Sequence, residues 1–417
     1  MKTRKDEEHK LKPHKQIAYL LSQFPEIHET FILREIIELE KNEIDIKLFS
    51  LKKCKDGIVH PQAKNYLTRT QYSSLLSLKT VHALIYFFCY MPIQCLKLII
   101  YILKKNYSSL EHLVKSLAVI PISLYYARLI QAYHIDHIHA HWATVPATSA
   151  LIISKILDIP YSFTAHAWDI FLTNPMLIEK VRGAEFVITC TGYNKRYLNS
   201  MLTGEQEGKV IKNYHGIDFD TLPKIRKKIE DTLIFSIGRL CEQKGFPYLL
   251  EAIGILKNRG HIFKCIIVGE GPDRKMLTQK IEELGIQNEI ELPGLKPQSY
   301  IFELFNRARM FVLPCVISKN GDRDGIPNVM IEALAMRTPV ISTTVSGVPE
   351  IIKNGETGIT VEPRNANKLA DAIQFLYEHQ ELSQKFTENG RKLVEQEFDV
   401  KKNVRELAKI FLEQTSL

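Results

Sequence analysis

Short apolar runs alternate with helical stretches along most of this chain, and this alternation restricts the fold more than any other feature. After Thr232 the expected strands begin with LIFSIG and continue through residues 265–268, 290–292, 310–314, 339–342 and 358–361. Strands that alternate with helices predict a parallel, doubly wound sheet. The same rhythm runs from residue 16 to 51 and returns at His137. We therefore expect an α/β protein with two Rossmann-like, doubly wound parallel-sheet domains.

The length of 417 residues, with 45% hydrophobic residues, suits two domains with separate cores. We place the first at residues 16–215 and the second at 216–399, with a final helix at 400–417. Residues 1–15 are mostly charged and precede only a short apolar run without a small-residue cleavage pattern. This favours a solvated tail over a signal peptide.

Asp324 and Glu332 lie on either side of a stretch that we expect to bind a ligand. Pro327 has the fixed φ of a helix start, which predicts a helix over residues 328–336 after a turn at Gly325. The amide end of a helix attracts anions, and the Glu332 side chain leans toward that end. Two acids beside an anion site suit a ligand with hydroxyls and phosphates. A structural carboxylate satisfied by neighbouring backbone fits the spacing of Glu332 equally well.

Arg239 and Lys244 follow the first strand of the second domain, five residues apart. A guanidinium holds phosphate oxygens through its planar fork and an ammonium acts as a point charge, so we expect this turn to bind a diphosphate. A solvated basic turn is the alternative. Gly269 and Gly271 lie in the turn after the next strand, where the missing side chains permit close approach of a ligand.

His166 is expected at the carboxyl end of strand 161–165, the end at which open α/β sheets bind ligands. Lone histidines are more often satisfied core or surface groups, but this position favours a functional role. His139 and His141 alternate on the preceding strand and could form a metal pair. Because we find no acid or cysteine ligand near them, we favour a structural role. Residues 28–30 fit a helix cap and an acceptor contact about equally.

Residues 71–130 depart from the alternating pattern. They contain VHALIYFFCYMPIQCLKLIIYILKK and a second apolar helix, with six basic residues against one acid. Pro92 and Lys97 interrupt the first run, so it falls short of the about 20 apolar residues that a spanning helix needs. Basic and aromatic residues among aliphatics favour a helical pair on a surface of anionic lipid. Burial of both helices against the first sheet is the alternative.

The net charge of +8 is spread along the chain, which suits an anionic ligand or a membrane surface, and no RNA-type motif supports nucleic-acid binding. Seven cysteines without CxxC pairing indicate neither a disulfide framework nor a zinc site. They favour a reducing, cytoplasmic compartment.

The stretch from Asp324 to Glu332, two acids around seven residues, resembles the donor-binding signature of the retaining glycosyltransferases of family GT4 (glycosyl transferases group 1). That family normally has Glu at the first position. GRLxxxKG at Gly238 to Gly245 and the strand-end histidine with Asp169 three residues later are similar to the same family. The opening FPEIHETFILREI resembles its colanic-acid and exopolysaccharide branch.

The resemblance implies the GT-B architecture, with the two domains facing a cleft and residues 400–417 crossing back onto the first domain. It also implies transfer of a sugar from a UDP-sugar or GDP-sugar, with retention, to a glycan or lipid-linked glycan in exopolysaccharide, capsule or O-antigen synthesis. The enzyme would be peripheral on the inner face of the cell membrane and would need no metal. The letters DxD at Asp322 to Asp324 lie within the donor signature.

The resemblance gives each site residue a role. Arg239 and Lys244 would stabilise the departing diphosphate, with help from the amides near Pro327 and Asn328. Glu332 would accept hydrogen bonds from ribose, while Asp324 and His166 would hold the transferred sugar. A nucleotide-sugar epimerase or hydrolase of the same fold, or a noncatalytic nucleotide-sugar-binding protein, are the alternatives.

Overall fold

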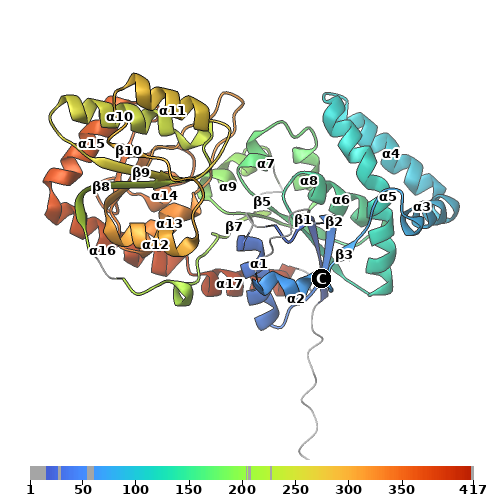
Figure 1. Cartoon of the computed structure of the whole chain (residues 1–417). Coiled ribbons are helices and arrows are strands. Elements are labelled where there is room, and N and C mark those ends of the chain that lie inside the picture. The colour runs from blue at the N-terminus through green and yellow to red at the C-terminus, as the bar shows by residue number, and fades with distance from the viewer. Residues whose placement is uncertain are drawn as a thin grey trace, which may run out of the picture. The chain divides into compact units, whose positions relative to one another are not determined.

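The computed structural model describes residues 16–26, 30–53, 61–202, 204, 208–225 and 228–414. The expected charged tail at 1–15 and the loop residues His28 and Glu29 lie outside these ranges. Two parallel sheets form the framework of the described chain (Figure 1).

The first sheet has seven strands in the order β3-β2-β1-β4-β5-β6-β7. Its described pairings are parallel; for example, Ile17 of β1 pairs with Ile46 of β2 on one side and with His137 of β4 on the other. The chain thus winds outward in both directions from the β1/β4 boundary, as in a doubly wound sheet. The strands are β1 Gln16–Phe24, β2 Asp45–Lys53, β3 Gln71–Tyr72, β4 His137–His141, β5 Tyr161–Ala165, β6 Val187–Thr189 and β7 Val210–Lys212.

The second sheet repeats this winding with six strands in the order β10-β9-β8-β11-β12-β13. Its described pairings are also parallel, and its inner strands are continuous apolar runs because helices cover both faces. The expected α/β class and the two doubly wound domains are confirmed. The strands are β8 Glu230–Ile237, β9 Lys264–Val268, β10 Ile290–Glu291, β11 Ala308–Leu313, β12 Val340–Thr343 and β13 Ile359–Val361.

Helices connect the strands, and side-chain caps begin several of them. The side chains of Ser77, Ser109 and Thr191 accept the first free amides of α3, α5 and α9. The helices are α1 Thr30–Lys41, α2 Lys64–Leu67, α3 Leu78–Tyr90, α4 Pro92–Asn106, α5 Leu110–Ala132, α6 Val145–Leu157, α7 Trp168–Phe171, α8 Leu177–Gly183, α9 Gly192–Asn199, α10 Phe246–Asn258, α11 Arg274–Glu283, α12 Gln298–Arg307, α13 Asn328–Ala335, α14 Val348–Ile351, α15 Ala366–Glu378, α16 Gln380–Glu397 and α17 Val400–Gln414.

Contacts divide the chain into two compact units, each made of more than one segment of the chain. The first unit contains residues 1–164, 175–187 and 404–417, and the second contains 165–174 and 188–403. The part of the chain around His166 and the segment up to residue 215 therefore group with the second unit, although we expected the boundary at 215. Phe411 of α17 is fully buried against the rings of Tyr19 and His139 in the first unit.

Residues 71–130 contain three long helices, α3, α4 and the greater part of α5, rather than one helical pair. α3 ends where the backbone amide of Met91 donates to the carbonyl of Phe87, and α4 begins directly after it at Pro92. The long apolar run therefore forms two helices that are bent by 109° relative to each other. α5 packs against α3, α4 and α6, and Figure 1 shows α3 and α4 (cyan) on its outer side. Among the described residues only α5 is long and apolar enough to cross a membrane by itself, and half of its most apolar window is buried.

Candidate active site

Lys244 and Asp324 meet where the second sheet changes its winding direction. Lys244 follows β8 and Asp324 follows β11, two neighbouring strands whose connections leave in opposite directions. Open α/β sheets bind ligands at the carboxyl ends of such strands. Lys244 Nζ donates to Asp324 Oδ1 at 2.9 Å and to Oδ2 at 2.8 Å. Strand order thus joins two residues that are 80 positions apart in the chain.

The loops that carry this pair are packed backbone to backbone. The amide of Val316 donates to the carbonyl of Gln243 at 3.0 Å. Gly245 has a φ of +67°, and a Cβ there would lie 1.9 Å from the carbonyl oxygen of Pro314. Only glycine fits this position, and it holds Lys244 against the loop after β11.

The electrostatics of the pair favour a charged lysine. The side chains of Lys244 and Asp324 are 14% and 23% exposed. Burial disfavours the ammonium, but the attraction and hydrogen bonding of Asp324, together with the nearby Cys315 and Cys241 sulfurs, outweigh it, so the pKa of Lys244 is raised. An ammonium has three donors, and Asp324 takes two of them. The third can bind an anionic ligand oxygen without displacing Asp324.

Arg239 lies at the start of the same loop and is exposed. The two cations therefore occupy different environments, although we expected from the sequence that they bind one diphosphate together. The carboxylates at Asp322 and Asp324 also differ, because Asp322 Oδ2 accepts from Gln243 Nε2 at 3.1 Å. Asp322 and Asp324 therefore contact two different residues of the loop after β8, Gln243 and Lys244.

Gly269 and Gly271 have a packing role that the sequence did not reveal. A Cβ on Gly269 would lie 2.0 Å from the carbonyl oxygen of Gly238, and one on Gly271 would lie 2.3 Å from that of Leu240. The amide of Leu240 donates to the carbonyl of Glu270 at 2.9 Å. The close approach that we expected of a ligand is made by the neighbouring turn, so both glycines hold the Arg239 loop in place.

Helix α13 begins at Asn328, with Pro327 in an extended conformation just before it. Met330, Ile331 and Leu334 of this helix are buried, as its apolar pattern predicts. Glu332 is only half-buried. The amide end of α13 and Gly325 lie in the loop that carries Asp324, so the helix start and Asp324 belong to one stretch of chain.

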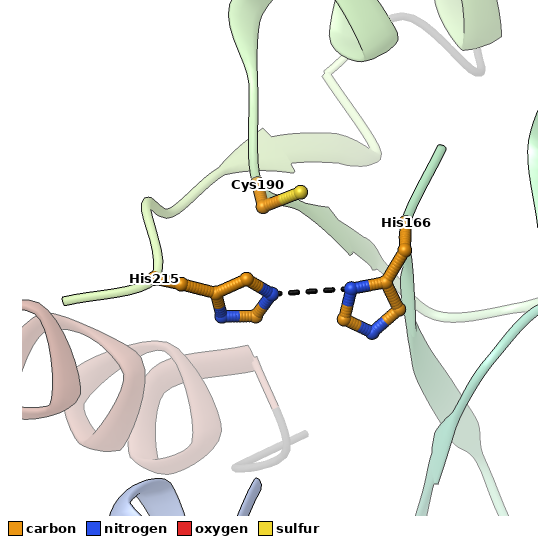
Figure 2. A group of neighbouring side chains, drawn as sticks. All are labelled: His166, Cys190 and His215. Carbon is orange, nitrogen blue, oxygen red and sulfur yellow. Dashed lines mark hydrogen bonds between the residues drawn. The ribbon is translucent and has the colours of Figure 1, made fainter. Parts of the chain in front are cut away.

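His166 lies directly after β5 and is buried, as expected for a strand-end residue. Asp169 Oδ1 accepts the backbone amide of His166 at 2.8 Å, so this acid shapes the turn. The ring is held by His215: His166 Nδ1 lies 3.1 Å from His215 Nε2, and the rings stack at 5.0 Å (Figure 2). Asn194 Nδ2 donates to the carbonyl of His166 at 3.2 Å.

Sequence reasoning missed His215 and Cys190 as neighbours of His166. Residue 215 was predicted only as the end of the first domain, and Cys190 was counted only among the seven cysteines. The available signal was that each follows an expected strand, as His166 does. Burial raises the pKa of the Cys190 thiol to about 12, with the charges of nearby acids adding to the effect.

Glu350, in the short helix α14, was also missed. Its carboxylate accepts the amides of Gly192 at 2.8 Å and Tyr193 at 2.7 Å, and the hydroxyl of Tyr214 at 2.8 Å. It therefore stabilises the amide end of α9, where a negative charge is favourable.

The expectation that no acid lies near His139 and His141 is wrong. Glu35 of α1 approaches them, and its Oε1 lies 2.8 Å from His141 Nε2. His139 contacts the hydroxyls of Ser162 at 2.8 Å and Thr164 at 3.0 Å. These hydrogen bonds agree with a structural role for the buried pair.

The segment that carries the site is similar to known proteins. Residues 218–393, which include Lys244, Asp324 and α13, match the family model described as "Glycosyl transferases group 1". The match covers less than half of the chain. WcaL of Salmonella typhimurium, assigned to colanic acid biosynthesis, is 34% identical over 42% of this chain and 44% of its own length. The amylovoran biosynthesis glycosyltransferase AmsK of Erwinia amylovora is 33% identical over 45% of this chain and 47% of its own length. These alignments therefore span less than half of each relative.

Solved structures cover nearly the whole chain. A glycosyltransferase from Rickettsia africae aligns with a TM-score of 0.69 and 18% identity over 97% of this chain and 99% of its own. HepE of Anabaena, solved with UDP and glucose, aligns with a TM-score of 0.68 and 16% identity over 96% of this chain and 100% of its own. At these identities the likeness concerns the fold, and it identifies the two-sheet architecture as GT-B.

Proposed function

We propose that this protein is a glycosyltransferase that moves a sugar from a nucleoside diphosphate sugar to a hydroxyl of a growing glycan, lipid-linked during synthesis. The observation that carries the proposal is the Lys244–Asp324 pair at the switch point of the group 1 segment. The names of WcaL and AmsK support exopolysaccharide synthesis, and the UDP bound to HepE supports a nucleotide donor.

The residues divide the donor between them. The diphosphate takes the third donor of Lys244, the exposed fork of Arg239 and the amides at the start of α13, which lie near Asn328 and Pro327. Glu332 accepts hydrogen bonds from the ribose, and its side chain is half-buried in the helix that follows the Asp324 loop. Asp324 and His166 hold the transferred sugar.

The chemical step then depends on charge. As the bond from the sugar to the diphosphate breaks, negative charge grows on the leaving oxygens, and Lys244 is already positioned to stabilise it. Its pairing with Asp324 fixes the ammonium before the donor arrives. Following the family resemblance, the acceptor attacks from the face that the diphosphate leaves, so the anomeric configuration is retained, and no metal takes part.

A transfer assay tests this function. The protein is incubated with a panel of UDP- and GDP-sugars, with and without a lipid-linked glycan extract, and the anomeric linkage of the product is determined by NMR. We expect one donor to be consumed only with acceptor and an unchanged anomeric configuration. Donor turnover without acceptor would favour the epimerase or hydrolase, and donor binding without turnover in any extract would favour the noncatalytic protein.

We further propose that α3 and α4 attach the enzyme to a membrane rich in anionic lipid. Each helix carries an exposed apolar stripe with spacings of three and four residues, while its buried residues pack toward α5. Exposed Lys79, Lys97 and Lys104 accompany the stripes, and no ion pair in the described part of the chain neutralises these three. The stripes consist of Leu78, Val81, Ile85 and Phe88 on α3, and Ile93, Leu96, Ile100 and Leu103 on α4, with Tyr107 directly after it.

A further inference from the structure

Three metal-ligating side chains converge in the second unit, outside the Lys244–Asp324 pair. His166 follows β5, Cys190 follows β6 and His215 comes shortly after β7. These strands are neighbours in the first sheet, and parallel strands present their carboxyl ends at one edge. Their strand order therefore explains why residues from three separate segments meet. Figure 2 shows the thiol of Cys190 beside the paired rings.

The geometry matches a metal site with one open position. The candidate ligand atoms of the three residues all lie within 4.8 Å of one another. The two ring nitrogens are 3.1 Å apart. Nitrogens bound tetrahedrally at about 2.0–2.1 Å from zinc lie roughly 3.3 Å from each other, so only a small movement of the rings is needed.

The donor set also restricts the kind of ion. Two imidazoles and a thiol suit zinc and softer transition metals, whereas magnesium, calcium and manganese prefer carboxylate, carbonyl and water oxygens. Three protein ligands leave the fourth position of a tetrahedral zinc ion for water or another ligand.

We propose that His166, Cys190 and His215 bind a Zn²⁺ ion. Binding forms a bond from zinc to Cys190 Sγ and releases the thiol proton to solvent. The ring that donates in the His166–His215 hydrogen bond transfers its proton to its other nitrogen, so that both facing nitrogens offer a lone pair to the metal. No electron transfer is involved.

If the protein is the proposed transferase, zinc bound at this site would affect its activity. His166 is the residue that we assign to the transferred sugar, and a zinc ion would occupy its Nδ1. Zinc would therefore inhibit transfer by blocking the sugar position, and a chelator would restore activity. The ion acts here as a regulator of an enzyme whose chemistry does not use it.

Cobalt titration tests the site without relying on activity. Co²⁺ added to the reduced full-length protein should give a thiolate-to-cobalt charge-transfer band in the near ultraviolet that saturates at one ion per chain, and Zn²⁺ should abolish it. Cys190→Ser should remove the band, and His215→Asn should weaken Zn²⁺ binding by about a hundredfold or more, since losing even an outer-shell partner costs 10- to 100-fold. Cys89→Ser, on the exposed surface of α3, is the matched control and should leave the titration unchanged.

The outcomes separate the two proposals. No charge-transfer band in the wild type, or a band that persists in Cys190→Ser with an unchanged melting temperature, would overturn the zinc site. The Glu35–His139–His141 group holds no sulfur, so it cannot produce this band. A cobalt band in a protein that transfers no sugar would support the site and count against the transferase function. Transfer without a band would do the reverse.

Discussion

The most informative single contact is the one between Lys244 and Asp324, because it joins a residue that we propose to bind phosphate to one that we propose to hold the sugar. From the sequence the two residues had separate tasks at separate turns. The 2.8–2.9 Å bonds make them one unit in which the acid orients the cation. A substitution at either position therefore affects both the charge of the site and the position of its partner.

Replacing Lys244 or Arg239 with Ala should weaken binding of a nucleoside diphosphate. Loss of a charged contact costs on the order of 1.5–3 kcal/mol, or roughly ten- to a hundredfold in affinity. Only Lys244→Ala should also lower the melting temperature, because it leaves the partly buried Asp324 carboxylate without its cation. Calorimetric titration with UDP and GDP, and melting of each variant, measure the two effects. Unchanged affinity in both variants would contradict the proposal that Arg239 and Lys244 bind the diphosphate.

Glu332→Gln tests the ribose contact. The amide keeps the volume of the side chain but presents a donor where the carboxylate accepted from a hydroxyl, which costs about 2–4 kcal/mol when both groups are buried by the ligand. Transfer should fall about thirtyfold or more, while the half-buried position keeps the fold stable. A variant with a lowered melting temperature and native donor affinity would show that Glu332 is structural.

Helices α3, α4 and α5 are all rich in apolar residues, but they differ in how much of their apolar surface is buried. α5 buries its middle, and the hydroxyl of Tyr126 donates to the carbonyl of Ser50 at 2.6 Å, which ties the helix to the first sheet. α3 and α4 leave their second apolar faces exposed. Burial against the first sheet therefore describes α5, and the membrane contact that we propose concerns only α3 and α4.

Leu96→Glu and Ile100→Glu, each on the exposed stripe of α4, should reduce binding to vesicles that contain anionic lipid. Each apolar side chain contributes on the order of 2 kcal/mol when it is buried, so each change should weaken binding about thirtyfold in cosedimentation. Leu295→Glu, at an exposed position in the second unit, should bind as the wild type does.

High salt should release part of the bound protein because the lysines beside the stripes act through screened charge. Retention through carbonate, with detergent needed for extraction, would point instead to a spanning α5. Concentration-dependent dimers that disappear in the two α4 variants would show that a second copy covers the stripes.

At the scale of the whole molecule, the first unit is discontinuous and is completed by the end of the chain. Residues 404–414 of α17 group with it, and Phe411 is buried among the rings of Tyr19, His139 and Phe186. The last helix is thus part of a core that begins with the first strand.

Phe411→Ala should therefore destabilise the protein strongly although it is far along the chain from the core that it fills. Removing a buried aromatic ring costs about 3–5 kcal/mol. Urea unfolding followed by fluorescence should detect this loss. Lys409→Ala, on the exposed side of the same helix, should change stability by less than about 0.5 kcal/mol. Equal effects of the two changes would contradict this role of α17.

Local patterns were enough to predict the strands other than the two-residue β3, most of the helices and the doubly wound class. The period of apolar residues and the turn residues between runs act over a few neighbours, so they can be recognised in the sequence. β5, for example, has the predicted bounds, and α13 begins at the predicted residue. Four helices were not predicted: α2, α7 and α14 have four residues each, too few to show a period, and α9 is mostly polar.

The sequence alone determined which residues follow strands, and so which ones could face a ligand. Only the tertiary structure decided which of these meet. Strand order brings Lys244 to Asp324 and His166 to Cys190 and His215, and it depends on packing between segments that are far apart in the chain. The same long-range packing buries α5, leaves α3 and α4 exposed and places Glu35 beside His141, because burial is set by neighbours that no local pattern identifies.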